Sequence, residues 1–598
     1  MKFLFSSLVL SSALCGALGL IDCSEVNRAA NEIPTGRVAA CDHFLGIENQ
    51  SYLNWYTNSD IDLYPNSAFL QGSDPQKPED GVAVHWRIDD GYVHLAVAAR
   101  ATGWVAFGLS EAGGMIGTDM VIFTAASPNE LIDAYTGEER LPQKDDCESD
   151  WELVSSNVDL EDGFIMFETK RLLNTNDPQD KPIIDDSSTV VSPHRAIAAW
   201  GDSEEMSYHG LNRARGAIRF HGQGDEETTF RASMEAAEGS VDLLAKNFTI
   251  PTEETIYESF CFTRQNLIDQ GLIDTQDKLN IIGWEPLVQT GNEPYVHHYV
   301  VTASNQPSCN LTAEELQMAF IEMTYVWAPG EKGIAFPDFL GVPLFGDDGF
   351  QAFRVEIHYN NPTLDAGVVD NSGVRFYWTS EPREQEIGIM NVGDPFVGVR
   401  GQTIGSGLSF HQFECPGSCS ALAGQEVTVL REYLHMHEVG LRITNEQIRD
   451  GEIVHKAAVE HWEFHQNGNA AVQQGSFVVQ PGDSFRTTCF YDDQDGSRTF
   501  GLASAEEMCM AFLYYYPRQK FDLGDGFSMA WFCGYDMFFP QCNATYESRA
   551  LDSKEELNRE YAIANPQCKE PPTEEDSGRK AFIGALGLAA GALGVLMI

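Results

Sequence analysis

The chain has 598 residues, and its 38 lysines and arginines stand against 89 aspartates and glutamates, which gives a formal net charge of −51. Its 10 tryptophans, 35 phenylalanines and 20 tyrosines carry too much apolar surface for a disordered chain. The length is typical of about three or four compact domains. The acidic excess argues against nucleic acid as a partner, because phosphates are bound by lysine and arginine.

Both ends of the chain carry predicted targeting segments. Residues 1–20 combine an early lysine, an apolar run and small residues before a cleavage point, which predicts a secretory signal peptide. Residues 581–598 are uncharged and follow Arg579 and Lys580, which predicts a C-terminal membrane anchor. A glycolipid-anchor signal and a buried helix are the alternatives for this tail.

Export predicts an oxidising compartment, and hence disulfides. Of the 13 cysteines, Cys15 lies in the signal, so the mature chain keeps an even number. The same route makes four sequons candidate glycosylation sites, at Asn49, Asn247, Asn310 and Asn543.

The sequence between the two ends predicts a series of short strands. In residues 82–88 apolar side chains alternate with others, the sequence Asp89-Asp90-Gly91 predicts a turn, and residues 93–97 resume the alternation. Many short strands without regular helices predict an all-β protein built of sandwiches. The expected divisions are an N-terminal segment (21–74), a first β unit (75–222), a linker (223–246), two further β units (247–395 and 396–545) and an acidic stalk (546–580).

Five of the 15 histidines form three clusters between residues 297 and 437, as a metal site requires. His435 and His437 are two residues apart, so in a strand both imidazoles project from one face and can reach one ion. His297 and His298 are adjacent, and they can share an ion only where a strand bends or ends. His358 lies in a third strand-like segment.

A methionine indicates which metal these histidines favour. Met508 precedes the aromatic run 512–517, and a thioether is a soft ligand suited to Cu(I). Zinc would accept three histidines and a water, but it gives no reason for the methionine. The sequence therefore predicts copper rather than zinc or a set of incidental histidines.

The order of these motifs resembles that of the copper type II, ascorbate-dependent monooxygenases over about half the chain. The shared pieces are the histidine clusters, Glu507-Met508-Cys509 and Tyr515-Tyr516-Pro517. The resemblance implies two coppers per chain, reduced by ascorbate, and the use of O2 to hydroxylate an activated C–H bond. The six implied ligands are His297, His298 and His358 for an electron-transfer copper, and His435, His437 and Met508 for the copper that binds dioxygen.

The first β unit resembles a DOMON domain through residues 103–110 and 118–121. A DOMON domain ahead of the catalytic pair is the layout of the dopamine β-monooxygenase-like members. Two cofactors are considered for this domain. Met115 and His209 are candidate haem ligands, as in some electron-transfer DOMON domains, and Asp119 is a candidate calcium ligand. An oligomer formed through this domain is a further expectation.

Several positions depart from the peptide-amidating members of the family. Their arginine for the substrate carboxylate is Tyr433 here, and their asparagine and tyrosine after the methionine are Met510 and Phe512. The expected substrate is therefore a small organic molecule, with a phenylethylamine-like amine as the family analogue. Tyr515 and its aromatic neighbours either line the substrate pocket or pack the core.

The resemblance also implies disulfide partners. The implied pairs are Cys261–Cys309, Cys489–Cys509, Cys415–Cys533, Cys419–Cys542 and Cys147–Cys568, with Cys23 and Cys41 left to each other.

These observations predict a DOMON β-sandwich followed by two copper-binding sandwiches of jelly-roll type. We expect the protein in the secretory pathway, extracellular or lumenal, and tethered by its C-terminal segment. A rival hypothesis is a non-catalytic redox protein with haem in its DOMON domain. A third is an adhesion or matrix protein whose catalytic half has decayed, and the complete ligand set argues against it.

Overall fold

The computed structural model describes residues 64–561 with internal gaps, and the structural statements below concern those residues. The signal peptide, the C-terminal anchor, Cys23, Cys41 and Cys568 lie outside the described residues. The gaps are 75–76, 78–79, 112, 138–140, 146, 162, 178, 189, 223–225, 274–276, 310–320, 328–332, 348, 362, 394–401, 463, 465–469, 472–474, 495, 497, 502–505, 525–526, 530 and 534–539.

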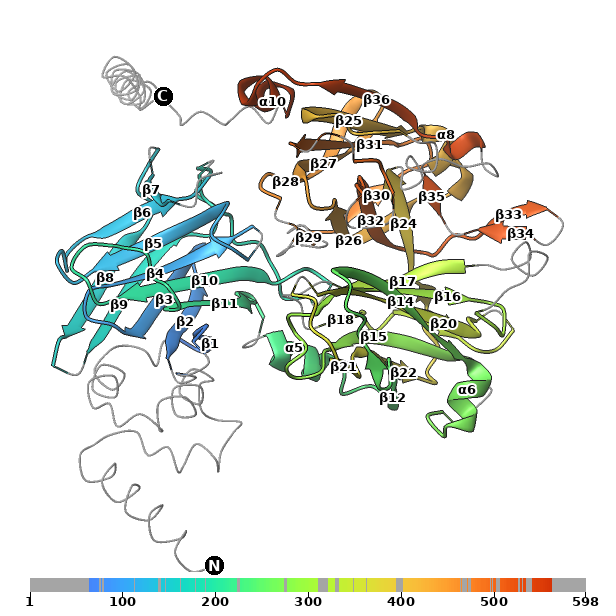
Figure 1. The fold of residues 1–598 in the computed structure, drawn as a ribbon, viewed down its shortest axis with the longest axis horizontal. Coiled ribbons are helices and arrows are strands. Elements are labelled where there is room, and N and C mark those ends of the chain that lie inside the picture. Colours follow the sequence, from blue (N-terminus) through green and yellow to red (C-terminus); the bar gives the residue numbers. More distant parts are fainter. Residues whose placement is uncertain are drawn as a thin grey trace, which may run out of the picture.

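The N-terminal unit is a sandwich of two antiparallel sheets (Figure 1). Its strands are β1 (Asn66–Gln71), β2 (Gly81–Asp89), β3 (Tyr92–Arg100), β4 (Trp104–Ser110), β5 (Thr118–Thr124), β6 (Leu131–Tyr135), β7 (Gln143–Lys144), β8 (Glu152–Asp159), β9 (Phe164–Leu172), β10 (His194–Gly201) and β11 (Arg213–Ile218). One sheet has the order β1-β2-β3-β9-β8 and the other β11-β10-β4-β5-β6-β7. The predicted hairpin is present, because β2 pairs with β3 across Asp90 and Gly91, which both have positive φ.

The middle unit is a second sandwich. Its elements are α5 (Glu226–Ser233), β12 (Gly239–Leu244), β13 (Phe248–Thr249), β14 (Thr255–Thr263), α6 (Arg264–Asp269), β15 (Leu279–Leu287), β16 (Val296–Ser304), β17 (Ile321–Trp327), β18 (Ile334–Ala335), β19 (Leu340–Leu344), β20 (Ala352–Asn360), β21 (Val369–Asp370), β22 (Gly373–Thr379) and β23 (Gln385–Glu386). The sheets β12-β22-β15-β19-β23 and β14-β20-β16-β17 contribute to one core, in which Trp284 and Tyr325 stack.

The third unit is also a sandwich. Its elements are β24 (Gly388–Gly393), β25 (Gly407–Cys415), α8 (Gly417–Ser420), β26 (Val427–His435), β27 (Gly440–Arg449), β28 (Glu452–Val459), β29 (Ala470–Ala471), β30 (Phe477–Val479), β31 (Ser484–Asp493), β32 (Met510–Tyr516), β33 (Phe521–Gly524), β34 (Phe527–Met529), β35 (Phe532–Cys533), β36 (Thr545–Ala550) and α10 (Lys554–Tyr561). Its main sheets are β29-β26-β32-β24-β35 and β28-β27-β31-β25-β36.

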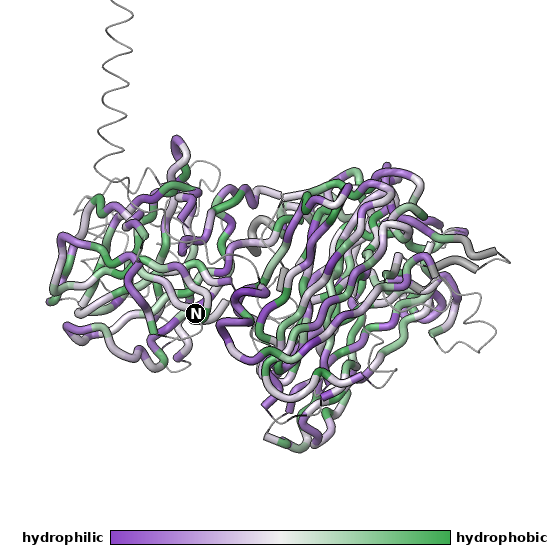
Figure 2. The backbone as a smooth tube through the Cα atoms, turned by 90° about the horizontal axis from the view of Figure 1, so that it is seen from above, coloured by the Kyte–Doolittle hydropathy of each residue, from purple (hydrophilic) through white to green (hydrophobic). Residues whose placement is uncertain are grey.

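The second and third units pack against each other through a continuous core. Tyr433, Met508 and Tyr514 of the third unit belong to the same buried cluster as Tyr299 and Val355 of the second. A buried ion pair between Arg518 and Glu322, 3.1 Å apart, also joins them. Figure 2 shows these two units as one body, with the N-terminal unit beside it.

The structure moves four of the predicted boundaries. β1 pairs with β2, so the first unit begins before residue 75. The 223–246 segment is not only a linker, because β12 pairs with β22. Its helix is polar, and this concealed the strand that buries Val241 and Leu243.

The other two boundaries move for the same kind of reason. β24 pairs with β32, so the third unit starts before residue 395. β36 pairs with β25, and α10 buries Leu557 and Tyr561 against Phe490, so the stalk cannot begin at 546. The acidic surface of α10 hid its buried face, since a short amphipathic helix carries few apolar residues.

Four of the expected disulfides are formed, in agreement with an oxidising compartment. They are Cys261–Cys309, Cys415–Cys533, Cys419–Cys542 and Cys489–Cys509. Cys147 is also disulfide-bonded, and Cys568, its expected partner, lies outside the described residues. Within residues 64–561, outside the gaps, no helix is long and apolar enough to cross a bilayer.

Candidate metal centre

Two neighbouring strands of the second unit bring three histidines together. His298 and His358 are register partners in β16 and β20, and a bulge lies between Val296 and His298. The bulge lets His297 turn toward the same point as His298, which a regular strand forbids. One nitrogen from each ring lies within 4.8 Å of the others, and the Nδ1 atoms of His297 and His298 are 3.1 Å apart.

This trio is buried, and burial disfavours the charged form of two of its rings, His298 and His358. His297 and His298 are each 7% exposed, and His358 is 1% exposed. Burial, reinforced by the neighbouring imidazoles, lowers the pKa of His298 well below 6.5 and that of His358 to about 2. Neutral rings keep a lone pair for a cation, so the trio is suited to a metal ion.

The second pair of histidines lies at the end of β26. The rings of His435 and His437 are 4.9 Å apart, as their spacing predicted. Both are buried, and burial, reinforced by the neighbouring His435 imidazole, lowers the pKa of His437 well below its usual range. The ring centroids of His435 and His298 are 6.2 Å apart, so the two groups adjoin across the interface between the second and third units.

Met508 precedes the strand that pairs with β26. Met510 is the register partner of His435, the last residue of β26, and the side chain of Glu507, the residue before Met508, accepts the backbone N–H of His437 at 3.0 Å. Met508 is 8% exposed, and the hydroxyl of Tyr491 donates to its carbonyl oxygen at 2.8 Å. The disulfide of Cys509 fixes the same turn.

Glu507 is a buried residue that holds this turn in place, and the motifs of the sequence did not predict this role. Its carboxylate accepts hydrogen bonds from the backbone N–H groups of His437 at 3.0 Å and Val439 at 2.8 Å. Burial raises its pKa to about 8, opposed by those backbone donors. Its place next to Met508 was the only signal in the sequence that could have found it.

Aromatic rings enclose the histidines. Tyr257 stacks on His358 with centroids 4.4 Å apart, and Phe464 stacks on His297 at 4.6 Å. Phe512 lies 6.2 Å from the ring of His435. Tyr515, by contrast, is fully buried against Trp531 in the core of the third unit. Core packing is therefore the correct alternative for Tyr515.

The donor set fits copper. Five buried imidazoles converge from two sandwiches, and Met508 lies two residues before the strand that pairs with β26. Imidazole suits both copper oxidation states, and a thioether favours the reduced one. No acidic side chain belongs to the described histidine trio, which separates it from a hard-cation site.

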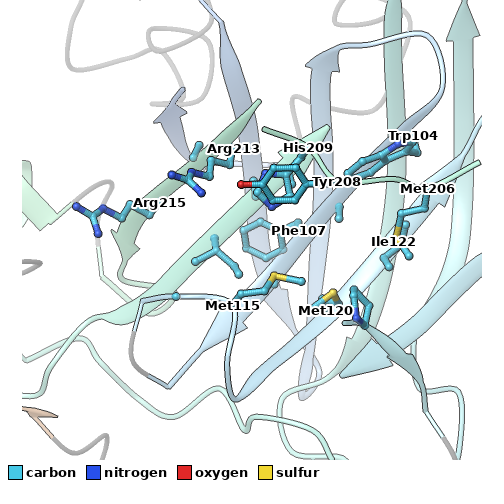
Figure 3. Close-up of a pocket in the computed structure, with 18 of the residues that line it drawn as sticks. Trp104, Phe107, Met115, Met120, Ile122, Met206, Tyr208, His209, Arg213 and Arg215 are labelled. Atoms are coloured by element: carbon cyan, nitrogen blue, oxygen red, sulfur yellow. The ribbon is translucent and has the colours of Figure 1, made fainter. Parts of the chain in front are cut away.

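The DOMON-like unit has a cavity of about 650 Å³, and both candidate haem ligands line it (Figure 3). Met115 and His209 share this lining with Trp104, and Arg213 and Arg215 stand at one side. Nδ1 of His209 lies 3.2 Å from the carbonyl oxygen of Gly210, and as a donor it would leave Nε2 as the acceptor. The volume is that of an ordinary small-molecule site.

Asp119 lies in a different part of the same unit, in a buried acidic cluster. Oxygens of Asp119, Asp133 and Asp180 lie within 4.8 Å of one another. Arg171 donates to Asp119 at 2.6 Å and contacts Asp180 at 3.2 Å. One oxygen of each of the three carboxylates has no hydrogen-bond partner among the described residues. Burial raises the pKa of Asp133 to about 7 and that of Asp180 to about 8.

The remaining described histidines are not metal ligands of these clusters. His411 is buried, and its ring nitrogens contact the Tyr546 hydroxyl at 2.8 Å and the Ile404 carbonyl at 3.2 Å. His455 contacts the Glu432 carboxylate at 3.1 Å. His465 lies outside the described residues.

Three family models match successive parts of the chain. Residues 78–193 match the DOMON domain. Residues 241–366 match the N-terminal domain, and residues 405–527 the C-terminal domain, of copper type II ascorbate-dependent monooxygenases. The fold and site thus define a DOMON domain joined to a paired copper monooxygenase module. The chain belongs to the copper type II ascorbate-dependent monooxygenase family.

Named relatives match about three quarters of the chain at low identity. "DBH-like monooxygenase protein 1" of Homo sapiens is 26% identical over 463 residues, which is 72% of this chain and 71% of the relative. "Dopamine beta-hydroxylase" of Bos taurus is 26% identical over 499 residues, 76% of this chain and 77% of the relative. The human "Dopamine beta-hydroxylase" is 26% identical over 494 residues, 76% of each chain.

Proposed function

We propose that this protein is an ascorbate-dependent copper monooxygenase that hydroxylates an activated C–H bond of a small organic molecule. The observation that carries the proposal is the convergence of five buried histidines on the interface of two sandwiches. The ring centroids of His298 and His435 are 6.2 Å apart, so the two ligand groups adjoin. The family membership supports the same activity.

The proposed assignment of ligands is supported by the placement of the histidines. His297, His298 and His358 would hold one copper, and His435, His437 and Met508 would hold the other. When bound, the copper ions supply the one-electron transfers and the activation of O2.

The polypeptide's own tasks are to hold these side chains and to exclude water. Glu507 fixes the backbone of His437, and Tyr491 fixes that of Met508. Tyr257 and Phe464 cover the rings of His358 and His297, so few solvent molecules can reach them. A dry, pre-arranged site protects a reactive oxidant from side reactions.

The proposed substrate is a phenylethylamine-like amine, by analogy with the named relatives. The buried aromatic ring of Phe512 beside His435 supports an apolar or aromatic group at the site. Ascorbate is the proposed reductant and O2 the co-substrate. Substrate choice depends on pocket details beyond the family motifs.

Metal analysis of the purified protein tests the proposal, followed by oxygen uptake with ascorbate and a panel of arylalkylamines. We expect two coppers per chain, and oxygen consumption that depends on ascorbate and on one class of amine. Zinc in place of copper, or copper without ascorbate-dependent oxygen uptake, would contradict the proposal. If only other apolar substrates support oxygen consumption, the proposed amine substrate is wrong but the proposed enzyme class stands.

A second candidate function is electron transfer through haem in the DOMON domain. It is favoured by one observation, that Met115 and His209 line the same cavity. A Soret band in the purified protein, lost in both Met115→Leu and His209→Gln, would support it. Absence of that band after haem addition would remove it.

Asp119 is the basis of a proposed calcium site in the same domain. The unsatisfied oxygens of Asp119, Asp133 and Asp180 fit a cation that prefers oxygen ligands. Secretion, tethering by residues 581–598 and an oligomer through the DOMON domain remain predictions from the sequence.

A further inference from the structure

Four described residues that follow β28 contact all three units of the molecule: Glu460, His461, Trp462 and Phe464. Figure 1 shows β28 on the side of the third unit that faces the N-terminal unit. We call these residues the 460–464 segment; residue 463 lies in a gap of the described chain.

At its first end the segment is held by the DOMON domain. The carboxylate of Glu111, directly after β4, accepts the backbone N–H of Glu460 at 2.9 Å and that of His461 at 3.2 Å. One charged side chain therefore satisfies two successive backbone donors. Charge-assisted bonds of this kind are about twice as strong as neutral ones.

The loop that carries Glu111 is itself tied down. Glu111 N–H donates to the Gly117 carbonyl at 3.2 Å, and Gly117 N–H donates to the Thr136 carbonyl at 3.1 Å. Gly117 has φ +65°, and a Cβ there would lie 2.9 Å from Cδ2 of His461. The close approach of the two domains and the positive φ both favour glycine at this point.

At its other end the segment reaches both groups of metal-binding histidines. The indole N–H of Trp462 donates to the backbone carbonyl of His437 at 2.9 Å. Phe464 stacks on the ring of His297 at 4.6 Å and lies 6.0 Å from that of His437. Trp462 and Phe464 are 7% and 5% exposed, so both contacts are buried.

We infer that the DOMON domain positions the metal-binding histidines through Glu111 and the 460–464 segment. Glu111 fixes the start of the segment, Trp462 then fixes the backbone of His437, and Phe464 restricts the ring of His297. Groups that orient a ligand from behind typically change metal affinity or activity about 10–100-fold. Glu111, Trp462 and Phe464 are positioning residues, because none of them is proposed to touch a reacting atom.

This inference rests on the proposed function for its catalytic consequence, but its physical content can be measured without copper. Hydrogen–deuterium exchange of the metal-free full-length protein reports whether the backbone near residues 437–441 and 460–464 is held. Glu111→Ala removes both acceptors, Glu111→Gln keeps one carbonyl acceptor, and exposed Glu130→Ala is the matched control on the same domain.

We expect both backbone regions to exchange at least about 10-fold faster in Glu111→Ala, with a smaller change in Glu111→Gln and none in Glu130→Ala. Trp462→Phe should accelerate exchange near residues 437–441 alone, because it removes only the indole donor. Unchanged exchange near residues 437–441 in a folded Glu111→Ala protein would overturn the inference.

The copper-loaded protein supplies a second test. In Glu111→Ala we expect two coppers per chain, an altered Cu(II) electron paramagnetic resonance spectrum, and kcat lowered about 10-fold with KM nearly unchanged. A wild-type spectrum with wild-type kcat would refute the inference even if the fold is less stable. Failure of the wild-type protein to bind copper would contradict the proposed function. The hydrogen–deuterium exchange result would then still test whether the DOMON domain holds the backbone near His437.

Discussion

The histidine cluster and the aspartate cluster, both buried within the part of the chain that the structure describes, differ in their chemistry. The cluster between the second and third units consists of buried imidazoles, while the DOMON cluster consists of carboxyl groups around Arg171. Burial lowers the pKa of His358 to about 2 and raises that of Asp133 to about 7. Both shifts disfavour the charged form.

The consequence for metal binding is opposite in the two clusters. A histidine held neutral is ready to donate its lone pair, whereas a carboxyl group near its pKa must lose a proton before it binds a cation. The histidine cluster is therefore prepared for a soft metal before the metal arrives. In the aspartate cluster, Asp133 and Asp180 must lose their protons before they can bind a cation.

The largest predicted effect concerns the thioether. Met508→Leu keeps the volume and removes the sulfur, so we expect the second copper to bind weakly and oxygen uptake to fall by about 1,000-fold or more. Met510→Leu, two residues along the same chain and also buried, is the matched control and should retain copper. Loss of copper in Met510→Leu but not in Met508→Leu would show that the sulfur ligand has been misassigned.

Two disulfides allow a comparison of stability, because one lies beside Met508 and the other lies in the second unit. Cys489–Cys509 closes a 20-residue separation beside Met508, and Cys261–Cys309 closes one of 48 residues in the second unit. The chain-entropy relation gives a loss in the free energy of unfolding of about 3 kcal/mol for opening the first and about 4 kcal/mol for the second. Denaturant unfolding of the double alanine variants measures both.

Copper retention separates the two disulfides further. Only the variant without Cys489–Cys509 should release copper more readily, because this bridge fixes the turn before β32. Equal copper retention in both variants would mean that the turn is held by Glu507 and Tyr491 alone.

The aspartate cluster predicts a stabilisation by calcium. At a concentration 100 times its dissociation constant, calcium should add about 2.7 kcal/mol, which raises the unfolding temperature of the DOMON domain by about 5–10 °C. Calorimetry of the full chain with calcium or EGTA measures the shift. Asp133→Asn should abolish it, and a copper-selective chelator should leave it unchanged. A shift that persists in Asp133→Asn would place the cation elsewhere.

The sequence predicted the histidine cluster because its geometry is local. The spacing of His435 and His437 specifies a shared strand face, and the adjacency of His297 and His298 required the bend that the bulge supplies. Of the aspartate cluster, the sequence predicted only Asp119 as a candidate ligand. Its partners Asp133 and Asp180 lie on other segments, and surface aspartates are too common in so acidic a chain to single them out.

The fold was predictable to a similar extent. Alternation of apolar residues predicted the sandwiches, but β12 and β24 were assigned to the wrong side of a boundary, because strand pairing is a long-range property. The contact of Glu111 with the 460–464 segment was also out of reach, because its partners are backbone N–H groups about 350 positions away, which leave no trace in residue type.

His411 gives the smallest effect and sharpens the comparison, because it is an imidazole buried outside both clusters. Burial lowers its pKa from 6.5 to about 4, opposed by its contact with the Ile404 carbonyl. Below pH 6.5 the unfolded chain takes up a proton that the folded protein refuses, so the free energy of unfolding falls as the pH drops toward 4. At pH 5 the loss is about 2 kcal/mol relative to pH 8.

His411→Gln keeps a donor and an acceptor without titrating. The amount by which its free energy of unfolding falls short of the wild type should therefore shrink by about 2 kcal/mol at pH 5. Denaturant unfolding of the metal-free proteins at the two pH values measures this, and parallel pH profiles would show that His411 is protonated in the folded state.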